Sequence, residues 1–149
     1  MTLLAIDPGT TQSGFVVWDN RGLRIVDSGV VSNDEMRLRI HFDTRQQVTQ
    51  VAIEMIASYG MAVGKEVFQT CLWIGRFMEC SETGLPQLIY RKDVKIHLCG
   101  TARATDSNIR QALIDKLGVV GTKRCPGPLY GVKSHAWPAL AVAVTALGL

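Results

Sequence analysis

The stretch LLAIDPGTTQSG, residues 3–14, decides how the rest of this chain folds. Four consecutive apolar residues end in Asp7, and Pro-Gly follows at once. Such a run is typical of a central strand that is apolar on both faces and stops where its carboxylate reaches water. This places Asp7 at the carboxyl end of a strand, where open α/β sheets bind ligands, and the small residues after it let a phosphate-bearing partner approach. A plain turn-forming Asp-Pro-Gly is the alternative for Asp7 alone.

A second apolar run, VAIEMI at residues 51–56, also carries a single acid, Glu54. A lone carboxylate inside a strand is unfavourable unless it is paired or bound to a metal ion. If the two strands lie side by side, Asp7 and Glu54 meet, and a divalent cation relieves their repulsion. Mg²⁺ takes oxygen ligands and keeps waters that a phosphate can replace. The pair therefore predicts a Mg²⁺ site, with Mn²⁺ as a substitute.

Composition bounds the class of protein. A chain of 149 residues with 47% hydrophobic residues predicts one folded domain over residues 1–149. No run approaches the ~18 apolar residues of a membrane span, and the first residues lack a secretory signal, so we expect a cytoplasmic protein with no membrane partner. Four widely spaced cysteines indicate reduced thiols. A net charge of +3 permits a nucleic-acid partner without demonstrating one.

Patterning predicts an α/β chain in which three antiparallel strands come first. The expected strands are 3–7, 15–18, 23–31, 51–56 and 87–90, with a hairpin turn at 19–22. Expected helices cover 34–47, 65–80, 91–98 and a segment from Thr105 or Asp106 to Gly118, and a final helix is capped by Ser134. The segment 65–80 is apolar nearly all round, so it is either deeply buried or shared with a second subunit.

Three segments resemble the RuvC family of Holliday-junction resolvases. They are AIDPGTT at 5–11 with Gly14, AIE at 52–54, and ALAVA at 139–143. The wider stretch from Glu54 to Phe77 resembles the bacteriophage branch of that family. The match runs over nearly the whole chain, and the order of the segments makes it more specific than the first motif alone.

The resemblance implies a ribonuclease H-like fold: a five-stranded mixed sheet, with three antiparallel amino-terminal strands plus parallel strands, flanked by helices. It implies one RuvC-like nuclease domain over 1–149, acting as a homodimeric crossover junction endodeoxyribonuclease on branched DNA such as Holliday junctions, with paired nicks. Mg²⁺ or Mn²⁺ would be the cofactor, with no nucleotide cofactor. A phage-encoded protein of this kind would work in the cytoplasm of a bacterial host.

The chain departs from the family in the first turn of the final helix. Family members usually carry two acids there, three residues apart, which complete the metal site; here His135 and Pro138 hold those positions. Histidine can bind a metal or orient the attacking water, whereas proline can do neither. The predicted catalytic and metal-binding residues are therefore Asp7, Glu54 and His135, with Asp106 as a further candidate ligand.

Seven residues are candidates for DNA contact. Tyr59, on a small-residue loop beside the acids, either stacks on an unpaired base or packs on the protein. Arg103 and Arg110 flank a helix start, which attracts phosphate. The loop 118–133 is long, basic and without periodicity, which indicates either a DNA-binding loop or a mobile solvated one. The candidates are Tyr59, Lys65, Arg103, Arg110, Lys123, Arg124 and Lys133.

Two other functions fit parts of the pattern. The chain could bind junctions without cutting them, because the acidic cluster is incomplete. Alternatively, residues 7–14 could be the phosphate loop of an actin-like or sugar-kinase-like ATPase, although such proteins need a second glycine-rich loop and about twice this length. The nuclease hypothesis explains more of the chain than either.

Overall fold

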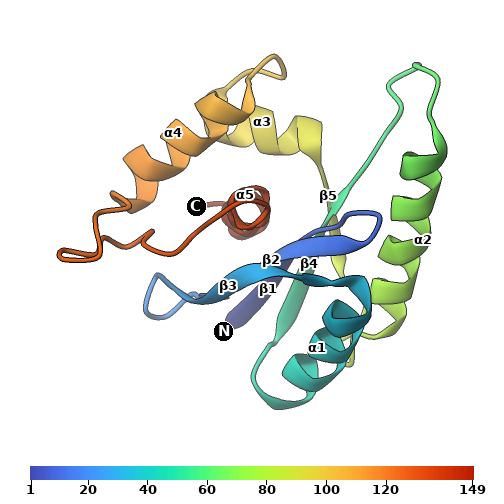
Figure 1. The fold of residues 1–149 in the computed structure, drawn as a ribbon, viewed down its shortest axis with the longest axis horizontal. Helices are drawn as coiled ribbons and strands as arrows, with labels where there is room; N and C mark the ends of the chain where they lie inside the picture. The colour runs from blue at the N-terminus through green and yellow to red at the C-terminus, as the bar shows by residue number, and fades with distance from the viewer.

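The computed structural model describes residues 1–149 and has a five-stranded mixed sheet between two layers of helices (Figure 1). The strand order is β3-β2-β1-β4-β5. The elements, in chain order, are β1 (Thr2–Asp7), β2 (Gln12–Asp19), β3 (Arg24–Ser32), α1 (Asn33–Gln46), β4 (Gln50–Met55), α2 (Lys65–Glu79), β5 (Gln87–Tyr90), α3 (Arg91–Cys99), α4 (Asp106–Leu117) and α5 (Ala136–Leu147).

The pairing of the strands confirms the predicted mixed sheet. β1, β2 and β3 are antiparallel neighbours, whereas β4 runs parallel to β1 and β5 parallel to β4. The β1–β4 register pairs Ile6 with Ile53, and the β1–β2 register pairs Asp7 with Gly14. The carboxyl ends of β1, β4 and β5 therefore meet at one edge of the sheet.

Each face of the sheet has its own hydrophobic core, because successive side chains of a strand point to opposite faces. On β1, Leu4 and Ile6 face α1 and α2, and Leu3 and Ala5 face the layer of α3, α4 and α5 (Figure 1). All four are fully buried. Burial of each large aliphatic side chain contributes about 1.5–3 kcal/mol, so these two cores hold the sheet edge in place.

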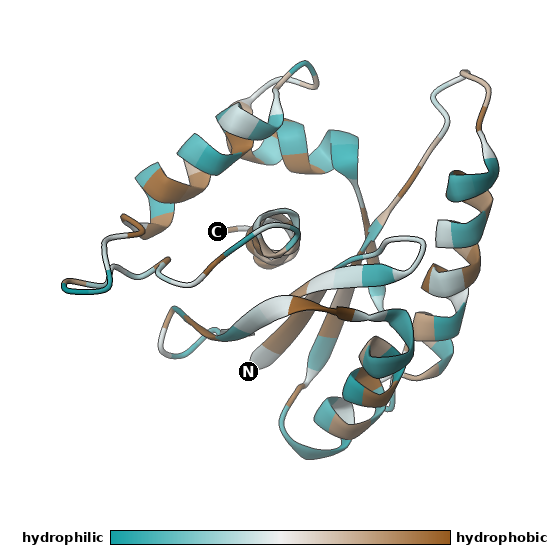
Figure 2. Cartoon of the chain, in the orientation of Figure 1, coloured by the Kyte–Doolittle hydropathy of each residue, from teal (hydrophilic) through white to brown (hydrophobic).

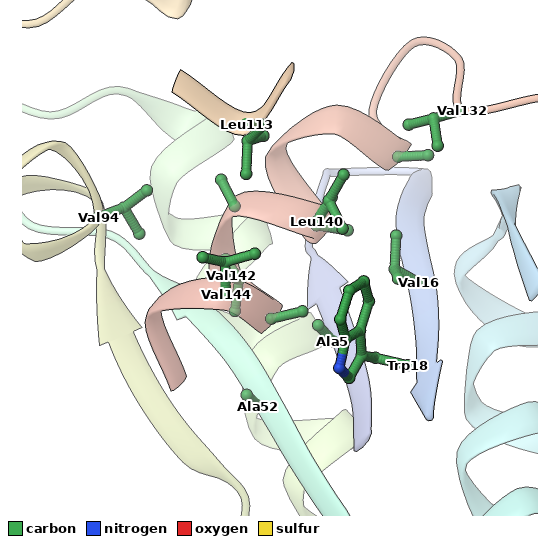
Figure 3. Packing of buried hydrophobic residues seen from close by; sticks show 14 of the residues in the cluster. Ala5, Val16, Trp18, Ala52, Val94, Leu113, Val132, Leu140, Val142 and Val144 are labelled. Carbon is green, nitrogen blue, oxygen red and sulfur yellow. The ribbon is translucent and has the colours of Figure 1, made fainter. Parts of the chain in front are cut away.

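Helix α5 lies close against the sheet because it is built from small residues. Ala139, Ala141 and Ala143 are fully buried, and the helix packs over β1 and β2. Figure 3 shows Leu140, Val142 and Val144 of this helix among Ala5, Val16 and Trp18 of the sheet, with Val94 and Leu113 from α3 and α4 beyond them. The small residues of the run ALAVA, residues 139–143, allow this close packing.

Several helix boundaries follow the sequence, but the predicted cap of α5 is wrong. The Ser32 side chain accepts a hydrogen bond from Glu35 N at the start of α1, and Thr105 caps α4 in a capping box with Asn108. Ser134 instead has a left-handed backbone, and α5 begins at Ala136 with no side-chain cap. The carbonyl oxygens of Lys133 and Ser134 accept from Ala136 N and Trp137 N, so a backbone turn replaces the hydroxyl.

Helix α2 is only partly buried. Thr70, Ile74 and Phe77 face the sheet, while Phe68 and Leu72 are 62% and 63% exposed. Figure 2 shows hydrophobic segments in several turns of this helix. The first of the two predicted alternatives, deep burial, is therefore wrong. None of the helices is long and apolar enough to span a bilayer.

Candidate active site

Asp7 and Glu54 stand side by side at the carboxyl edge of the sheet. They follow the paired residues Ile6 and Ile53 on parallel strands, so they lie at the same level and face the α5 layer. Their side chains are only 17% and 7% exposed. The structure thus brings together two acids that are far apart in the chain.

The electrostatics of the pair are those of partly buried, mutually repelling carboxylates. Burial, with the neighbouring charge of Asp7 as the second cause, raises the pKa of Glu54 from an ordinary value of 4.5 to about 7. Burial also raises the pKa of Asp7, although the hydrogen bond and charge of His135 act against this shift. A bound cation would lower both pKa values by stabilising the ionised forms, so the site is suited to binding one.

His135 joins the site because α5 begins very close to β2. Its Nδ1 lies 3.0 Å from Asp7 Oδ2, and its side chain is 66% exposed. A Cβ atom on Gly14, the β2 partner of Asp7, would lie 2.1 Å from the His135 carbonyl oxygen. Only glycine therefore lets the start of α5 reach this position.

The turn between β1 and β2 is locked by a buried polar network that the sequence did not reveal. Ser13 Oγ donates to Asn33 Oδ1 at 2.6 Å, and Asn33 Nδ2 donates to Gly9 O at 2.9 Å. Gly9 N in turn donates to Ser13 Oγ at 3.3 Å. Both polar side chains are 1% exposed. Because buried polar groups are costly to leave unpaired, this network holds the residues that follow Asp7 in one conformation.

Arg91 is the functional candidate that sequence reasoning missed. Its Nη1 lies 3.5 Å from both carboxylate oxygens of Glu54, and its Nη2 forms an ion pair with Asp106. Burial of the guanidinium lowers its pKa, but the charges of Glu54 and Asp106 outweigh this and raise it. Arg91 follows the predicted strand 87–90 directly, so the shared edge of parallel strands was the signal that could have found it.

Two cavities are connected to the acids through their lining residues: Arg91, which contacts Glu54, lines both, and His135, which contacts Asp7, lines one. The larger, of about 590 Å³, lies between α4 and the start of α5, and its polar lining includes Asp106, Arg110, Lys133 and His135. The smaller, of about 300 Å³, is lined by Tyr59, Arg91, Lys92, Lys95 and Ala102. We call these two cavities, which share Arg91, the basic trough. Of the predicted DNA contacts, Tyr59, Arg110 and Lys133 line it.

The structure shows how two of these residues, Tyr59 and Arg110, are placed. Tyr59 is 56% exposed with a left-handed backbone, so the alternative that it packs on the protein is wrong. The Arg110 guanidinium lies 4.5 Å from the centre of the Trp137 ring, which holds it at the wall of the larger cavity. The trough therefore presents an exposed aromatic ring at one end and a fixed cation at the other.

The other four predicted DNA contacts line neither cavity. Lys65 and Arg103 are exposed at the start of α2 and before α4. Lys123 and Arg124 lie in the loop at the far left of Figure 1, across the molecule from the loop after β4. Within that loop Gly121 and Pro126 form a bridge and Leu129 is buried, while residues 121–126 are exposed to solvent.

The donor atoms fit a single hydrated divalent ion. Asp7 and Glu54 supply two carboxylates, which is the number Mg²⁺ commonly takes from a protein beside waters and phosphate oxygens. No group of three or more His, Cys, Asp and Glu side chains is arranged to hold a metal ion. Asp106, the further candidate ligand, is 86% exposed and paired with Arg91, and Pro138 lines the larger cavity without offering a donor.

We expect Glu54→Gln to stabilise the protein in a pH-dependent way when divalent ions are chelated. The folded pKa of Glu54 lies above its ordinary value, so stability falls as pH rises from about 4.5 to about 7 and stays low above that. The variant should exceed the wild type by on the order of 2–3 kcal/mol in free energy of unfolding at pH 8. The gain should shrink towards pH 5, and urea unfolding at both pH values measures it; an equal gain at both would contradict the burial effect.

Comparisons with solved structures identify the fold. A Thermus thermophilus RuvC structure aligns over 99% of this chain and 94% of its own, with a TM-score of 0.73 and 22% sequence identity. T. thermophilus RuvC in complex with Holliday junction substrate aligns over 97% and 92%, with a TM-score of 0.72 and 23% identity. No protein-family model matches the chain, and no curated protein does so at a significant level. The chain thus has the ribonuclease H-like fold of RuvC, as its motifs predicted.

Proposed function

We propose that this chain, which has the RuvC fold, is a metal-dependent endonuclease that cuts branched DNA by hydrolysing phosphodiester bonds. One observation carries the proposal: Asp7 and Glu54 adjoin each other, mostly buried, and each contacts a residue that lines the basic trough, His135 for Asp7 and Arg91 for Glu54. Two carboxylates without a cation would repel a DNA phosphate, whereas with one they form a site for it. The proposed class is a crossover junction endodeoxyribonuclease of the phage type.

Each site residue has a proposed task in the reaction. Asp7 and Glu54 would hold the Mg²⁺ or Mn²⁺, which when bound would supply an activated water and stabilise the charge that develops on the phosphate. Asp7 Oδ2 lies 3.0 Å from His135 Nδ1, which leaves Nε2 as the ring nitrogen that does not contact Asp7. No protein group hydrogen bonds to Nε2, so it is free to accept the proton of the attacking water.

The basic trough is the proposed path of one DNA strand. Lys92 and Lys95 line the end near Tyr59, and Arg110 and Lys133 line the other. Cations at both ends neutralise phosphates on either side of the cut, and an exposed tyrosine can stack on an unpaired base, worth about 1–3 kcal/mol. The combination favours distorted or branched DNA over a continuous duplex.

We propose that two copies pair through α2, giving two sites for opposed strands. Phe68 and Leu72 form an exposed apolar strip one turn apart, continued by Gly75, around which there is open space. We expect Phe68→Glu to convert a dimer to a monomer in light scattering, because a charge in an apolar contact is strongly unfavourable. Leu85→Glu, at a side chain that is 83% exposed outside α2, is the matched control and should stay dimeric. A dimer that survives Phe68→Glu would exclude this face.

A second candidate keeps the fold but not the catalysis. His135 and Pro138 stand where related resolvases carry acids, and Arg91 already contacts Glu54, which favours weak metal binding. On this alternative the chain binds junctions and protects or presents them without cutting.

The test is cleavage of a labelled four-way junction with Mg²⁺ or Mn²⁺, beside a linear duplex of the same sequence and a sample with EDTA. The nuclease proposal predicts paired nicks in the junction only, and none with EDTA. Tight junction binding without products at any Mg²⁺ or Mn²⁺ concentration would reject it in favour of the second candidate.

A further inference from the structure

We infer that the site holds one divalent ion per chain and that the guanidinium of Arg91 is its second positive charge, positioned to contact the substrate phosphate. The role of Arg91 towards phosphate rests on the proposed function, whereas the number of ions does not. The inference starts from a mismatch between the donors present and the needs of a two-ion site. Two ions about 3.5–4 Å apart share bridging carboxylates, and only Asp7 and Glu54 are in place to serve.

The other side chains near the acids either have a partner already or offer no donor atom to a metal ion. The Nδ1 atom of His135 bonds to Asp7, Pro138 has no donor, and the Asp106 carboxylate is paired with Arg91. A second ion would therefore have to break the ion pair between Arg91 and Asp106. One ion needs only the free oxygens of Asp7 and Glu54.

Arg91 is held in the site from two directions. It begins α3 directly after β5, in which Ile89 pairs with Glu54 and Tyr90 with Met55, so its backbone lies just beyond the level of Glu54. Asp106 at the first position of α4 anchors Nη2, while Nη1 stays 3.5 Å from Glu54. That second distance exceeds the ~2.7–2.9 Å of a charge-assisted hydrogen bond, so Glu54 can exchange Arg91 for a metal ion without loss of the anchor.

The charges balance for one ion. The three carboxylates of Asp7, Glu54 and Asp106 and the one guanidinium leave two negative charges, which one divalent cation neutralises. A second divalent ion would leave a surplus of positive charge in a site that already has Arg110 and Lys133 on its wall. The Arg91 guanidinium therefore supplies the positive charge that a second ion would otherwise supply.

The guanidinium is also accessible to DNA. Arg91 is the residue that lines both cavities of the trough, and its side chain is 29% exposed. Its planar fork suits two oxygens of one phosphate, which a lysine ammonium cannot match.

Mn²⁺ titration of the full-length protein without DNA, followed by calorimetry and by the electron spin resonance of free Mn²⁺, tests the inference. We expect one Mn²⁺ per chain, and about tenfold tighter binding in Arg91→Met because a competing cation is removed. Arg37→Met, which removes an exposed arginine of α1, is the matched control and should leave the affinity unchanged. Two ions per wild-type chain, no binding, or an unchanged or weaker affinity in Arg91→Met would each overturn the inference.

Junction cleavage then separates this inference from the proposed function. If the wild type cuts, Arg91→Met should cut about 100-fold more slowly, although it binds the metal ion more tightly. Arg91→Lys should recover only part of the lost cleavage rate. Full cleavage by Arg91→Met would overturn the phosphate contact while the nuclease proposal stands. A wild type that never cuts but binds one Mn²⁺, more tightly in Arg91→Met, would reject the nuclease and leave the single-ion site standing.

Discussion

Asp7→Asn is expected to reduce junction cleavage by about 10³-fold or more while the protein stays folded and still binds the junction. The amide keeps the size of the side chain and an oxygen that can accept from His135 Nδ1, so the α5 contact survives. It removes half of the negative charge that the acid pair offers to a cation. Because burial already raises the pKa of Asp7, losing this charge should not destabilise the protein. The measurement is single-turnover cleavage beside junction binding in EDTA.

The matched control for Asp7→Asn is Asp93→Asn, which removes an exposed carboxylate from the first turn of α3. It should cut at the wild-type rate, so that a general effect of charge on DNA binding is excluded. Cleavage that persists unchanged in Asp7→Asn would remove the proposed mechanism, because no other carboxylate pairs with Glu54 at this edge.

Gly14→Ala is expected to have the largest effect on the architecture of the site. The added Cβ would lie 2.1 Å from the carbonyl oxygen and 2.4 Å from the carbonyl carbon of His135, both backbone atoms that cannot rotate away. The start of α5 must therefore move away from β2. Overpacking of this kind costs about 1–3 kcal/mol or more, and the shift separates His135 from Asp7. Urea unfolding followed by tryptophan fluorescence measures the first effect, and the cleavage rate measures the second.

Gly64→Ala is the control for a change from glycine to alanine as such. Gly64 precedes α2 with a φ of −95°, and the added atom would meet only the flexible end of the Glu66 side chain, at 3.3 Å. The change should therefore alter the free energy of unfolding by less than about 1 kcal/mol. If Gly14→Ala were as stable as Gly64→Ala and cut normally, the close approach of α5 to β2 would not be needed to position His135.

The fold could be predicted from the sequence because its signals are local and repeated. Residues that are close in the chain are enough to recognise a buried strand that ends in an acid, a second strand like it, and a helix of small residues. The mixed sheet with its parallel strands was implied by the family resemblance that these motifs carry, and in the structure the register of Ile6 with Ile53 sets the two acids level. Hydrophobic periodicity carries this information because it reflects burial.

What the sequence could not supply were contacts between residues distant in the chain. The fixing of the β1–β2 turn by Asn33, the ion pair of Arg91 with Asp106 and the exposure of Phe68 depend on which elements meet after folding. Ser134 was also predicted to cap α5, but the amides of Ala136 and Trp137 donate to the backbone carbonyl oxygens of Lys133 and Ser134 instead.

The sequence by itself determined where the strands end, and so which two carboxylates lie at the ligand-binding edge. Only the tertiary structure decided which contacts surround them: the contact of the predicted His135 with Asp7, which a glycine on β2 allows, and an arginine held between Glu54 and the start of α4. The physical reason is that strand patterns record burial, which is local, whereas the field at a buried acid is the sum of charges from every element packed around it.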